Sequence, residues 1–351
     1  MSGRHSPEKS KQSTMRDVAE MAGVSLMTVS RVLSNEGKVS DKTRERVMQA
    51  VDSLNYKLNI SARSLSSSKS FVLGFFYDLS VGGFIREYLI GTMLRCNELG
   101  YHLILEPCDF AEMDINDFIK KMVRRHALDG IIVPPPLNDN RTLLDALEVE
   151  DVRYVRVGSG AQLKRSLSVM IDDYAASVEM TEYLIANGHK KIGFIHGDTQ
   201  QETDALRFSG FSDTMKKHKL KVNAGWVGKG NFQFEEGMIA AEKILKKQQV
   251  TAIFSANDDM AAGAIAAARK LGIDVPEEVS VVGFDDTPLA VSMWPKLTTI
   301  HQPIFEMSKA AVDLLVESIR GKNDADNAME PQTRLDYHLQ VRESVKNIAL
   351  N

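Results

Sequence analysis

Short apolar runs rich in β-branched and aromatic residues alternate with longer amphipathic runs from Phe71 to about residue 284. The short runs are typical of buried strands, and the longer runs have the apolar spacing of helices. The expected strands are FVLGFFY (71–77), YHLILE (101–106), GIIVP (130–134), VRYVRV (152–157), SVMI (168–171), KIGFIH (191–196), TAIFSA (251–256) and VSVVGF (279–284). The expected helices cover about 83–99, 113–126, 173–187, 203–219, 234–247 and 257–271. This α/β alternation predicts parallel sheets with helices on both faces, and its length favours two similar lobes over one sheet.

The first 58 residues have a different pattern, in which three short helical runs follow a polar tail (1–13) that we expect to be disordered. Thr14 with Asp17 is typical of a capped helix start, and Gly23-Val24-Ser25 ends that helix and begins the next. The expected inward positions are Val18, Ala19, Ala22, Val29, Val32, Leu33, Val47, Ala50, Val51 and Leu54. Residues 14–58 therefore predict a helix-turn-helix DNA-binding domain whose second helix enters the major groove.

The outward face of the second helix carries Leu26 and Met27, for which thymine methyl groups are natural targets. Arg31, one turn later, has the geometry that recognises guanine, and nearby hydroxyl groups suit phosphate oxygens. The structural alternative is a generic three-helix bundle whose exposed apolar residues have no function. The candidate DNA-binding residues of this domain are Thr14, Ser25, Leu26, Met27, Thr28, Ser30, Arg31 and Asn35.

A Ser-rich stretch follows, and within it residues 59–69 predict a hinge helix or linker. NISARSLS (59–66) is too short to be helical alone in water. A helix formed on DNA would insert Leu65 between base pairs, with Ala62 and Arg63 beside the minor groove. The alternative is an ordinary linker.

Charge is unevenly distributed along the 351 residues, whose net charge is −4. Residues 1–69 contain 12 Lys and Arg against 7 Asp and Glu, whereas the remainder contains 31 against 40. A basic head on an acidic body indicates a polyanionic partner for the head. Two cysteines, no apolar run of membrane-spanning length and no secretory signal predict a cytoplasmic, nucleoid-associated protein without a membrane partner.

Enzyme motifs such as GxSxG, a P-loop or HExxH do not occur, so we expect no catalytic residue and no cofactor. The eight histidines are not at metal-ligand spacing, so we expect no metal site.

Polar residues follow several of the expected strands, where ligands bind in doubly wound sheets. They are Asp78, the pair Asp172 and Asp173, Asp198, Asn257 and Asp285. Tyr77, Phe84 and Phe232 are the aromatic candidates, and Arg207 lies in the helix after KIGFIHG. Planar polar groups with aromatic rings suit a sugar. Asn257 and Asp285 have an alternative role as helix caps, and Tyr77 as a core residue.

The run MRDVAEMAGVSLMTVSRVLSNEGKVSDKTRERVMQAVDSLNY (15–56) with ARSL (62–65) resembles the head and hinge of lactose-repressor (LacI-type) regulators. The resemblance continues through GHKKIGFIHG (188–197), LRFSGF (206–211), TAIFSANDDMAAGAI (251–265), VPEEVSVVGFDD (275–286) and LTTIHQP (297–303). It implies a body of two Rossmann-like lobes like type I periplasmic-binding proteins, spanning 70–351 and serving effector binding and dimerisation. Lobe one would take about 70–170 and 300–326, and lobe two about 171–299 and 327–351.

The same resemblance implies a homodimer, or a dimer of dimers, on a near-palindromic operator. It makes Leu26, Met27 and Arg31 base readers and Leu65 the minor-groove wedge. It supports effector contacts by Phe84, Arg207, Phe232, Asn257 and Asp285, with one of Asp172 or Asp173. Gln201 stands where purine-binding relatives carry an arginine, and Phe84-Ile85 replaces their aromatic pair.

We therefore expect a transcription repressor of carbohydrate-utilisation genes that a mono- or oligosaccharide inducer releases. The alternative in the same class is a purine- or nucleoside-responsive repressor. The alternative from another class is a sugar-binding protein with an idle DNA-binding head. Effector identity, the direction of its effect, the operator and the choice between dimer and tetramer stay open.

Overall fold

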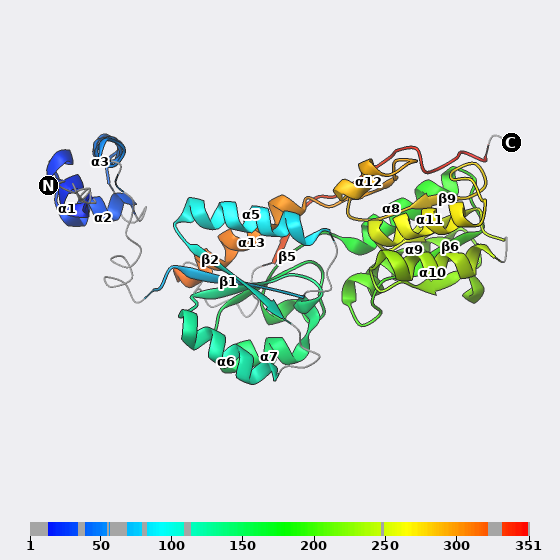
Figure 1. Cartoon of the computed structure of the whole chain (residues 1–351), viewed down its shortest axis with the longest axis horizontal. Coiled ribbons are helices and arrows are strands. Elements are labelled where there is room, and N and C mark those ends of the chain that lie inside the picture. Colours follow the sequence, from blue (N-terminus) through cyan, green and yellow to red (C-terminus); the bar gives the residue numbers. More distant parts are fainter. Residues whose placement is uncertain are drawn as a thin grey trace, which may run out of the picture. The chain divides into compact units, whose positions relative to one another are not determined.

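The computed structural model describes residues 13–33, 39–54, 56, 69–78, 83–108, 114–246, 249–321 and 332–349. The chain divides into two compact units, Met1–Ser70 and Phe71–Asn351 (Figure 1). Asn35 and the hinge candidates Ala62, Arg63 and Leu65 lie outside the described residues, as does nearly all of the expected N-terminal tail.

The described residues of the N-terminal unit form three helices, α1 (Met15–Ala22), α2 (Leu26–Leu33) and α3 (Asp41–Ser53). Thr14 and Asp17 form the capping box at the start of α1, and Gly23 ends that helix in a left-handed conformation with φ 61°. Glycine is favoured there because a Cβ atom is strained at positive φ. The helices share one small core, made of Val18, Ala19, Ala22, Val29, Val32, Val47, Ala50 and Tyr56.

The first lobe of the body is built on a parallel six-stranded sheet with the order β11-β5-β4-β3-β1-β2. Its strands are β1 (Val72–Asp78), β2 (His102–Cys108), β3 (Gly130–Val133), β4 (Tyr154–Val157), β5 (Leu167–Met170) and β11 (Gln332–Arg334). One face is covered by α5 (Ile85–Leu99) and α13 (Ile304–Ile319), and the other by α6 (Ile115–His126) and α7 (Arg141–Val149) (Figure 1). Short 3-10 turns, η1 (Leu137–Asp139) and η2 (Leu163–Arg165), follow β3 and β4.

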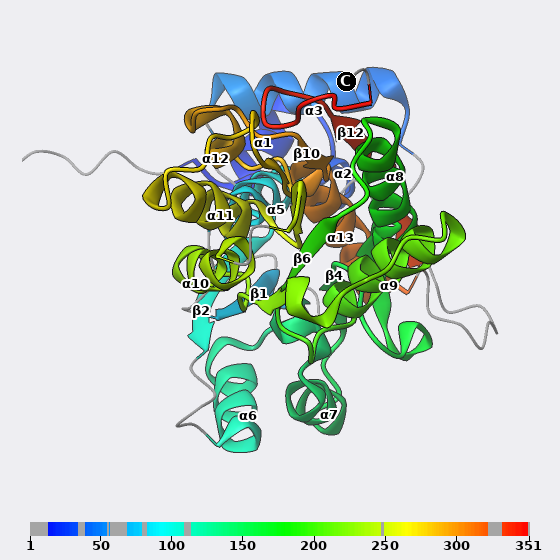
Figure 2. The ribbon, with the colours of Figure 1, turned by 90° about the vertical axis from the view of Figure 1, so that its right-hand side faces the viewer.

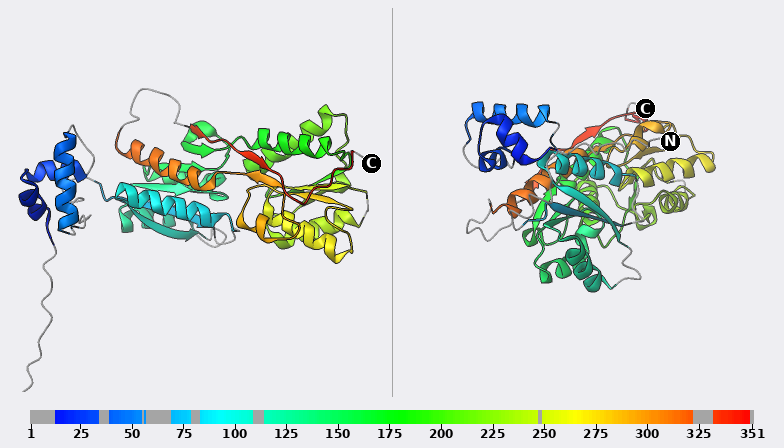
Figure 3. Two further views of the ribbon diagram at one scale, coloured as in Figure 1. Left: turned by 90° about the horizontal axis from the view of Figure 1, so that it is seen from above. Right: turned by 60° about the vertical axis from the view of Figure 1, so that its left-hand side comes forward.

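The second lobe has a parallel sheet with the order β7-β6-β8-β9. Its strands are β6 (Ile192–His196), β7 (Val227–Lys229), β8 (Ala252–Ser255) and β9 (Ser280–Val282), with the turn η3 (Ala224–Trp226) before β7. The pair α8 (Asp173–Ala186) and α9 (Glu202–Lys217) covers one face (Figures 2 and 3). The other face is covered by α10 (Phe234–Leu245) and α11 (Asp258–Lys270), with the short α12 (Pro288–Ser292) after β9.

The chain crosses between the lobes through β10 (Thr299–His301) and β12 (His338–Gln340), which pair antiparallel. The position of strand β11 differs from the expected lobe boundary. The sequence predicts residues 327–351 in lobe two. Gln332–Arg334 instead pairs with β5 in the sheet of lobe one. The return to lobe two therefore comes after Arg334, and Ser344 then accepts a hydrogen bond from Val281 N through its carbonyl oxygen at 3.0 Å.

Six helices lie close to the ranges expected from the sequence, whereas α7, α12 and α13 were not expected. Helix α13 packs beside α5 on the same face of the sheet and buries Ile304, Met307, Ala311, Val312, Leu315 and Val316. Its packing partners α5, β3, β4 and β5 are far away in the sequence, so no local pattern of strand and helix predicts where this helix packs. Among the described residues, no helix has both the length and the apolar content that a bilayer-spanning segment needs.

Candidate effector site and nucleic-acid interface

Helix α2 presents two apolar side chains at its N-terminal end. Leu26 and Met27 are 45% and 64% exposed, whereas Val29 and Val32 on the opposite face are buried. The predicted outward orientation of Leu26 and Met27 is therefore present in the folded head. Ser30 and Arg31 are also exposed.

The hydroxyl groups at the helix starts have local roles. Ser25 Oγ accepts a hydrogen bond from Thr28 N at 3.2 Å and lies 2.9 Å from Thr28 Oγ1. Thr14 Oγ1 donates to Asp17 Oδ2 at 2.7 Å. These residues shape the helix-turn-helix, and their exposed hydroxyls lie at helix N-termini, where phosphate oxygens are favoured.

A cavity of about 430 Å³ lies between the two lobes of the body. Residues at the carboxyl ends of the parallel strands converge on it, as expected for doubly wound sheets. Nine of the residues predicted from the sequence line it: Asp78, Phe84, Asp173, Asp198, Gln201, Arg207, Phe232, Asn257 and Asp285.

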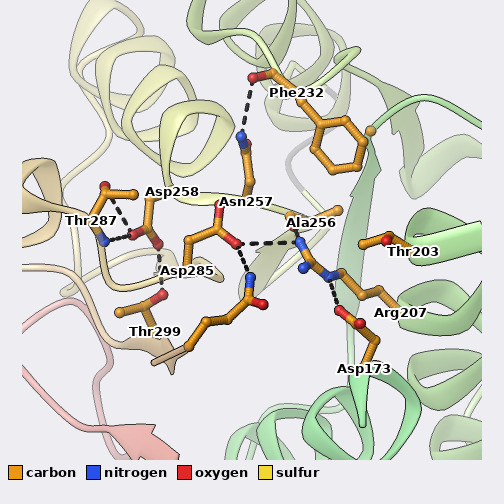
Figure 4. A network of polar contacts seen from close by, with 12 residues as sticks. Asp173, Thr203, Arg207, Phe232, Ala256, Asn257, Asp258, Asp285, Thr287 and Thr299 are labelled. Carbon is orange, nitrogen blue, oxygen red and sulfur yellow. Dashed lines mark hydrogen bonds and ion pairs between the residues drawn. The ribbon is translucent and has the colours of Figure 1, made fainter. Parts of the chain in front are cut away.

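Arg207 is the central cation of this cavity and is only 4% exposed. Its Nε donates to Asp173 Oδ1 at 2.8 Å, and its Nη1 donates to the carbonyl oxygen of Ala256 at 2.6 Å (Figure 4). Asp285 Oδ1 lies 3.5 Å from Nη1. The guanidinium carbon lies 3.6 Å from the ring centroid of Phe284. This cation is therefore held by acids, a carbonyl and an aromatic face.

Asp285 is buried and has an unusual backbone conformation, with φ 114°. Burial raises its pKa to about 7, and the charge of Arg207 and a hydrogen bond from Gln302 oppose that rise. Gln302 Nε2 donates to Asp285 Oδ1 at 2.6 Å. Asp285 can therefore exchange a proton near neutral pH and act either as a donor or as an acceptor toward a ligand.

Phe232 forms an aromatic wall of the cavity and also has positive φ, 59°. Asn257 Nδ2 donates to its carbonyl oxygen at 3.1 Å (Figure 4). The ring of Phe232 lies so close to Gly197 that a Cβ atom on this glycine would be 2.1 Å from the ring. The side chain of Asn257 also caps α11, because its Oδ1 accepts a hydrogen bond from Met260 N at 2.9 Å. Asn257 therefore both caps the helix, as the alternative interpretation expects, and lines the cavity.

Hydrogen bonds join the lobes around the cavity. Thr203 Oγ1 of α9 donates to the carbonyl oxygen of Ser159 at 3.1 Å, and Glu202 N donates to Asp139 Oδ2 at 2.9 Å. Ser159 Oγ donates to Asp173 Oδ2 at 2.5 Å. The first lobe thus contacts the N-terminal turns of α8 and α9.

Two predicted effector residues do not line the cavity. The carboxylate of Asp172 caps α8 through Ala175 N at 3.0 Å and pairs with Arg334 at 2.7 Å. Tyr77 precedes Asp78 on β1, and successive strand residues point to opposite faces of a sheet, so only Asp78 reaches the cavity. The ring of Tyr77 instead lies 6.5 Å from that of Phe75, two positions earlier on the strand.

The cavity also includes residues that were not predicted, among them Tyr88, Ser159, Thr203 and Gln302. Tyr88 and Thr203 are each four positions from a predicted residue on the same helix, Phe84 and Arg207, so helical spacing could have identified them. Ser159 and Gln302 lie on connecting segments, and their position depends on how the lobes pack. No local sequence signal marks them.

A helix-turn-helix head and a two-lobed body with an interlobe cavity together define a ligand-responsive DNA-binding regulator. Residues 14–59 match the family model of bacterial regulatory proteins of the lacI family, and residues 181–345 match a periplasmic binding protein-like domain.

Two curated relatives extend the match over nearly the whole chain. The transcriptional repressor PurR of Vibrio vulnificus is 34% identical over 338 residues, covering 95% of this chain and 99% of that protein. PurR of Haemophilus influenzae (strain PittEE) is 32% identical over 342 residues, with the same coverage. The chain belongs to the LacI family and is a sequence-specific DNA-binding transcription repressor. Because these relatives are repressors, the expectation that the chain is not an enzyme is confirmed.

Solved structures show the same architecture. The complex of the regulator CelR with cellobiose has a TM-score of 0.72 at 27% identity and covers 95% of this chain and 100% of that chain. The lac repressor dimer bound to operator and the anti-inducer ONPF has a TM-score of 0.72 at 26% identity and covers 96% and 100%. The expected fold class, a helical head with a two-lobed periplasmic-binding-protein-like body, is confirmed.

Replacing Arg207 by Leu should strongly destabilise the body, because Asp173 and Asp285 then become buried carboxylates without their cation. We expect a loss of about 3–5 kcal/mol in the free energy of unfolding, measured by urea denaturation. The control is Arg334→Leu, which breaks the neighbouring exposed pair with Asp172 and should cost no more than about 1 kcal/mol. Equal effects of the two substitutions would contradict the central role of Arg207.

The raised pKa of Asp285 should make stability depend on pH. The folded protein holds this proton between about pH 4 and 7, where the unfolded chain has released it, because the pKa rises from 3.8 to about 7 on folding. The contribution of Asp285 to the free energy of unfolding should therefore fall as pH rises through this window and stay constant above it. Asp285→Asn should lose this slope when urea denaturation is compared at several pH values. An identical slope in both proteins would refute the assignment.

Proposed function

We propose that the protein is a cytoplasmic, dimeric repressor that binds a near-palindromic operator and changes its operator affinity when a small effector occupies the interlobe cavity. The observation that carries this proposal is one cavity whose wall is built from both lobes and centred on the buried Arg207. A ligand in such a cavity favours one relative position of the lobes. The heads of a dimer would respond to that position through their hinges, with a coupling of about 1–3 kcal/mol.

For the effector we propose a purine base or nucleoside. The relatives named PurR are purine-responsive repressors and are similar over 95% of this chain, which favours the purine alternative over the sugar expected from the sequence. The site supports this class. Phe84, Tyr88 and Phe232 offer aromatic surfaces to a flat ring, while Arg207 and Asp285 provide donors and acceptors at its edge.

A carbohydrate is the second candidate. The structure of CelR contains cellobiose and matches this chain at 27% identity over 95% of its length. The cavity also presents Gln201 where purine-binding relatives carry an arginine, and Asp78 and Asp173 add carboxylates. Amide and carboxylate groups bind the adjacent hydroxyls of a sugar.

For the operator we propose that Leu26, Met27 and Arg31 read base edges, with hydroxyls of Thr14, Ser25, Thr28 and Ser30 near phosphates. The hinge candidates Ala62, Arg63 and Leu65, and Asn35, remain predictions from the sequence. The support for the base readers is their exposure on α2, the second helix of a helix-turn-helix, with Leu26 and Met27 at its N-terminal end and Arg31 in its last turn.

Replacing Arg31 by Ala should weaken binding to an operator selected from random DNA by about 1–3 kcal/mol and relax the preference at one base pair. Met27→Ala should change the preference at a neighbouring base pair. Both are measured by repeating the selection with the full-length variant. The matched control is Met48→Ala on α3, where methionine is similarly exposed at 43% and outside the proposed interface. An altered selection with Met48→Ala and none with Met27→Ala would reject the assignment.

Effector class is tested by titrating the full-length repressor on its selected operator with guanine, hypoxanthine, adenosine, glucose and cellobiose. We expect a purine to change operator affinity about 5–150-fold and the sugars to have no effect. A response to sugars alone would assign the carbohydrate instead. Phe232→Ala should abolish the response, whereas Phe234→Ala, an exposed phenylalanine outside the cavity lining, should retain it. A ligand that binds the cavity without changing operator affinity would refute the coupling.

A further inference from the structure

Asp258 is a fully buried carboxylate next to the effector cavity, but it does not line it. It is the first residue of α11 and follows Asn257, which holds Phe232. Its Oδ2 accepts hydrogen bonds from Thr287 N at 2.7 Å and Thr287 Oγ1 at 3.2 Å, and its Oδ1 accepts one from Thr299 Oγ1 at 2.6 Å (Figure 4). These three bonds connect α11 with two other segments of the chain.

The first of these segments is the strained turn after β9. Asp285 and Asp286 are successive non-glycine residues with φ 114° and 56°, and Thr287 follows directly. Such conformations persist only where the surrounding structure determines them. Asp258 holds the downstream end of the turn through Thr287. Upstream, Gly283 leaves the space for its carboxylate, since a Cβ there would lie 2.4 Å from Asp258 Oδ1.

The second segment is the crossover strand β10. Thr299 lies on this strand, three positions before Gln302, which donates to Asp285. The backbone amide of Asp285 also donates to the carbonyl oxygen of Ile300 at 2.9 Å. The turn that carries Asp285 is therefore tied to the same carboxylate as strand β10, which contains Ile300 and leads into Gln302.

We propose that Asp258 is a positioning residue of the effector site, which sets the place of the Asp285 carboxylate in the cavity by joining the 285–287 turn and β10 to α11. It acts through Asp285 and does not touch the effector. This inference rests on the proposed function, because it concerns the same cavity. It also explains why an acid is used: an asparagine has one acceptor oxygen and would turn an NH₂ group toward a donor.

Charge and hydrogen bonding can be separated in this region, because Asp259 is the next residue of α11. It is partly buried, and its charge contributes to the raised pKa of Asp285. The side chains of Thr287 and Thr299 bond to Asp258 and not to Asp259. Asp259→Asn therefore removes a nearby charge and leaves the three bonds of Asp258 in place. Burial raises the pKa of Asp258 well above its usual value, so the effect of Asp258→Asn lies in hydrogen bonding. It replaces one acceptor oxygen by an NH₂ group and so breaks this arrangement.

The test uses the full-length protein in two measurements. Without effector, hydrogen exchange of the Asp285 amide should become about tenfold faster in Asp258→Asn and stay unchanged in Asp259→Asn. With hypoxanthine or cellobiose, whichever binds the unaltered protein, Asp258→Asn should lower the affinity about tenfold or more, and Asp259→Asn should change it far less. Thr299→Val removes one of the three bonds and should give an intermediate effect in both measurements. It also serves as the test variant if Asp258→Asn does not fold.

Unchanged exchange at Asp285 in the Asp258 and Thr299 variants overturns the proposal. Faster exchange with unaltered effector affinity overturns it too, because the turn would then be held without consequence for the site. If neither hypoxanthine nor cellobiose binds the unaltered protein, the proposed effector classes fail, and exchange at Asp285 still decides whether Asp258 holds the turn.

Discussion

The buried guanidinium of Arg207 joins parts of the chain that are far apart in the sequence, and the cavity between the lobes depends on it. It bonds to Asp173 at the start of α8 and to the carbonyl oxygen of Ala256 after β8, and it lies near Asp285 after β9. A cation is stable away from water only with acceptors close around it. The strand ends of the second lobe therefore meet at one point, and the acids that surround this cation form the polar wall of the site.

The same residues connect the site to the crossing between the lobes. Asp285 bonds to Gln302 directly after β10, and Asp139 and Ser159 of the first lobe contact the N-terminal turn of α9. A ligand in the cavity would thus contact groups whose positions depend on the relation of the two lobes. The cavity wall and the contacts between the lobes share one set of hydrogen bonds. A ligand that changes these bonds would therefore change the relative position of the lobes in this LacI-family repressor.

A few cavity positions do not by themselves identify the class of effector. Gln201 and the Phe84-Ile85 pair favoured a sugar, and both Gln201 and Phe84 do line the cavity. Similarity to PurR proteins over nearly the whole chain favours a purine. A bound ligand contacts several walls of the cavity, and each position contributes only part of the binding free energy. One changed side chain therefore does not define the class of ligand.

The sequence by itself determined the features that depend on neighbouring residues: the capped helices of the head, the exposure of Leu26 and Met27, the strand–helix alternation, and the polar residues that follow several strands. These follow from local periodicity, capping and turn chemistry, and from residues that resemble one family. Tertiary structure alone decided that β11 joins the first sheet, that α13 packs beside α5, that Asp173 and not Asp172 faces the cavity, and that Ser159 and Gln302 complete it. Each of these depends on contacts between distant segments, and a pattern of neighbouring residues carries no information about such contacts.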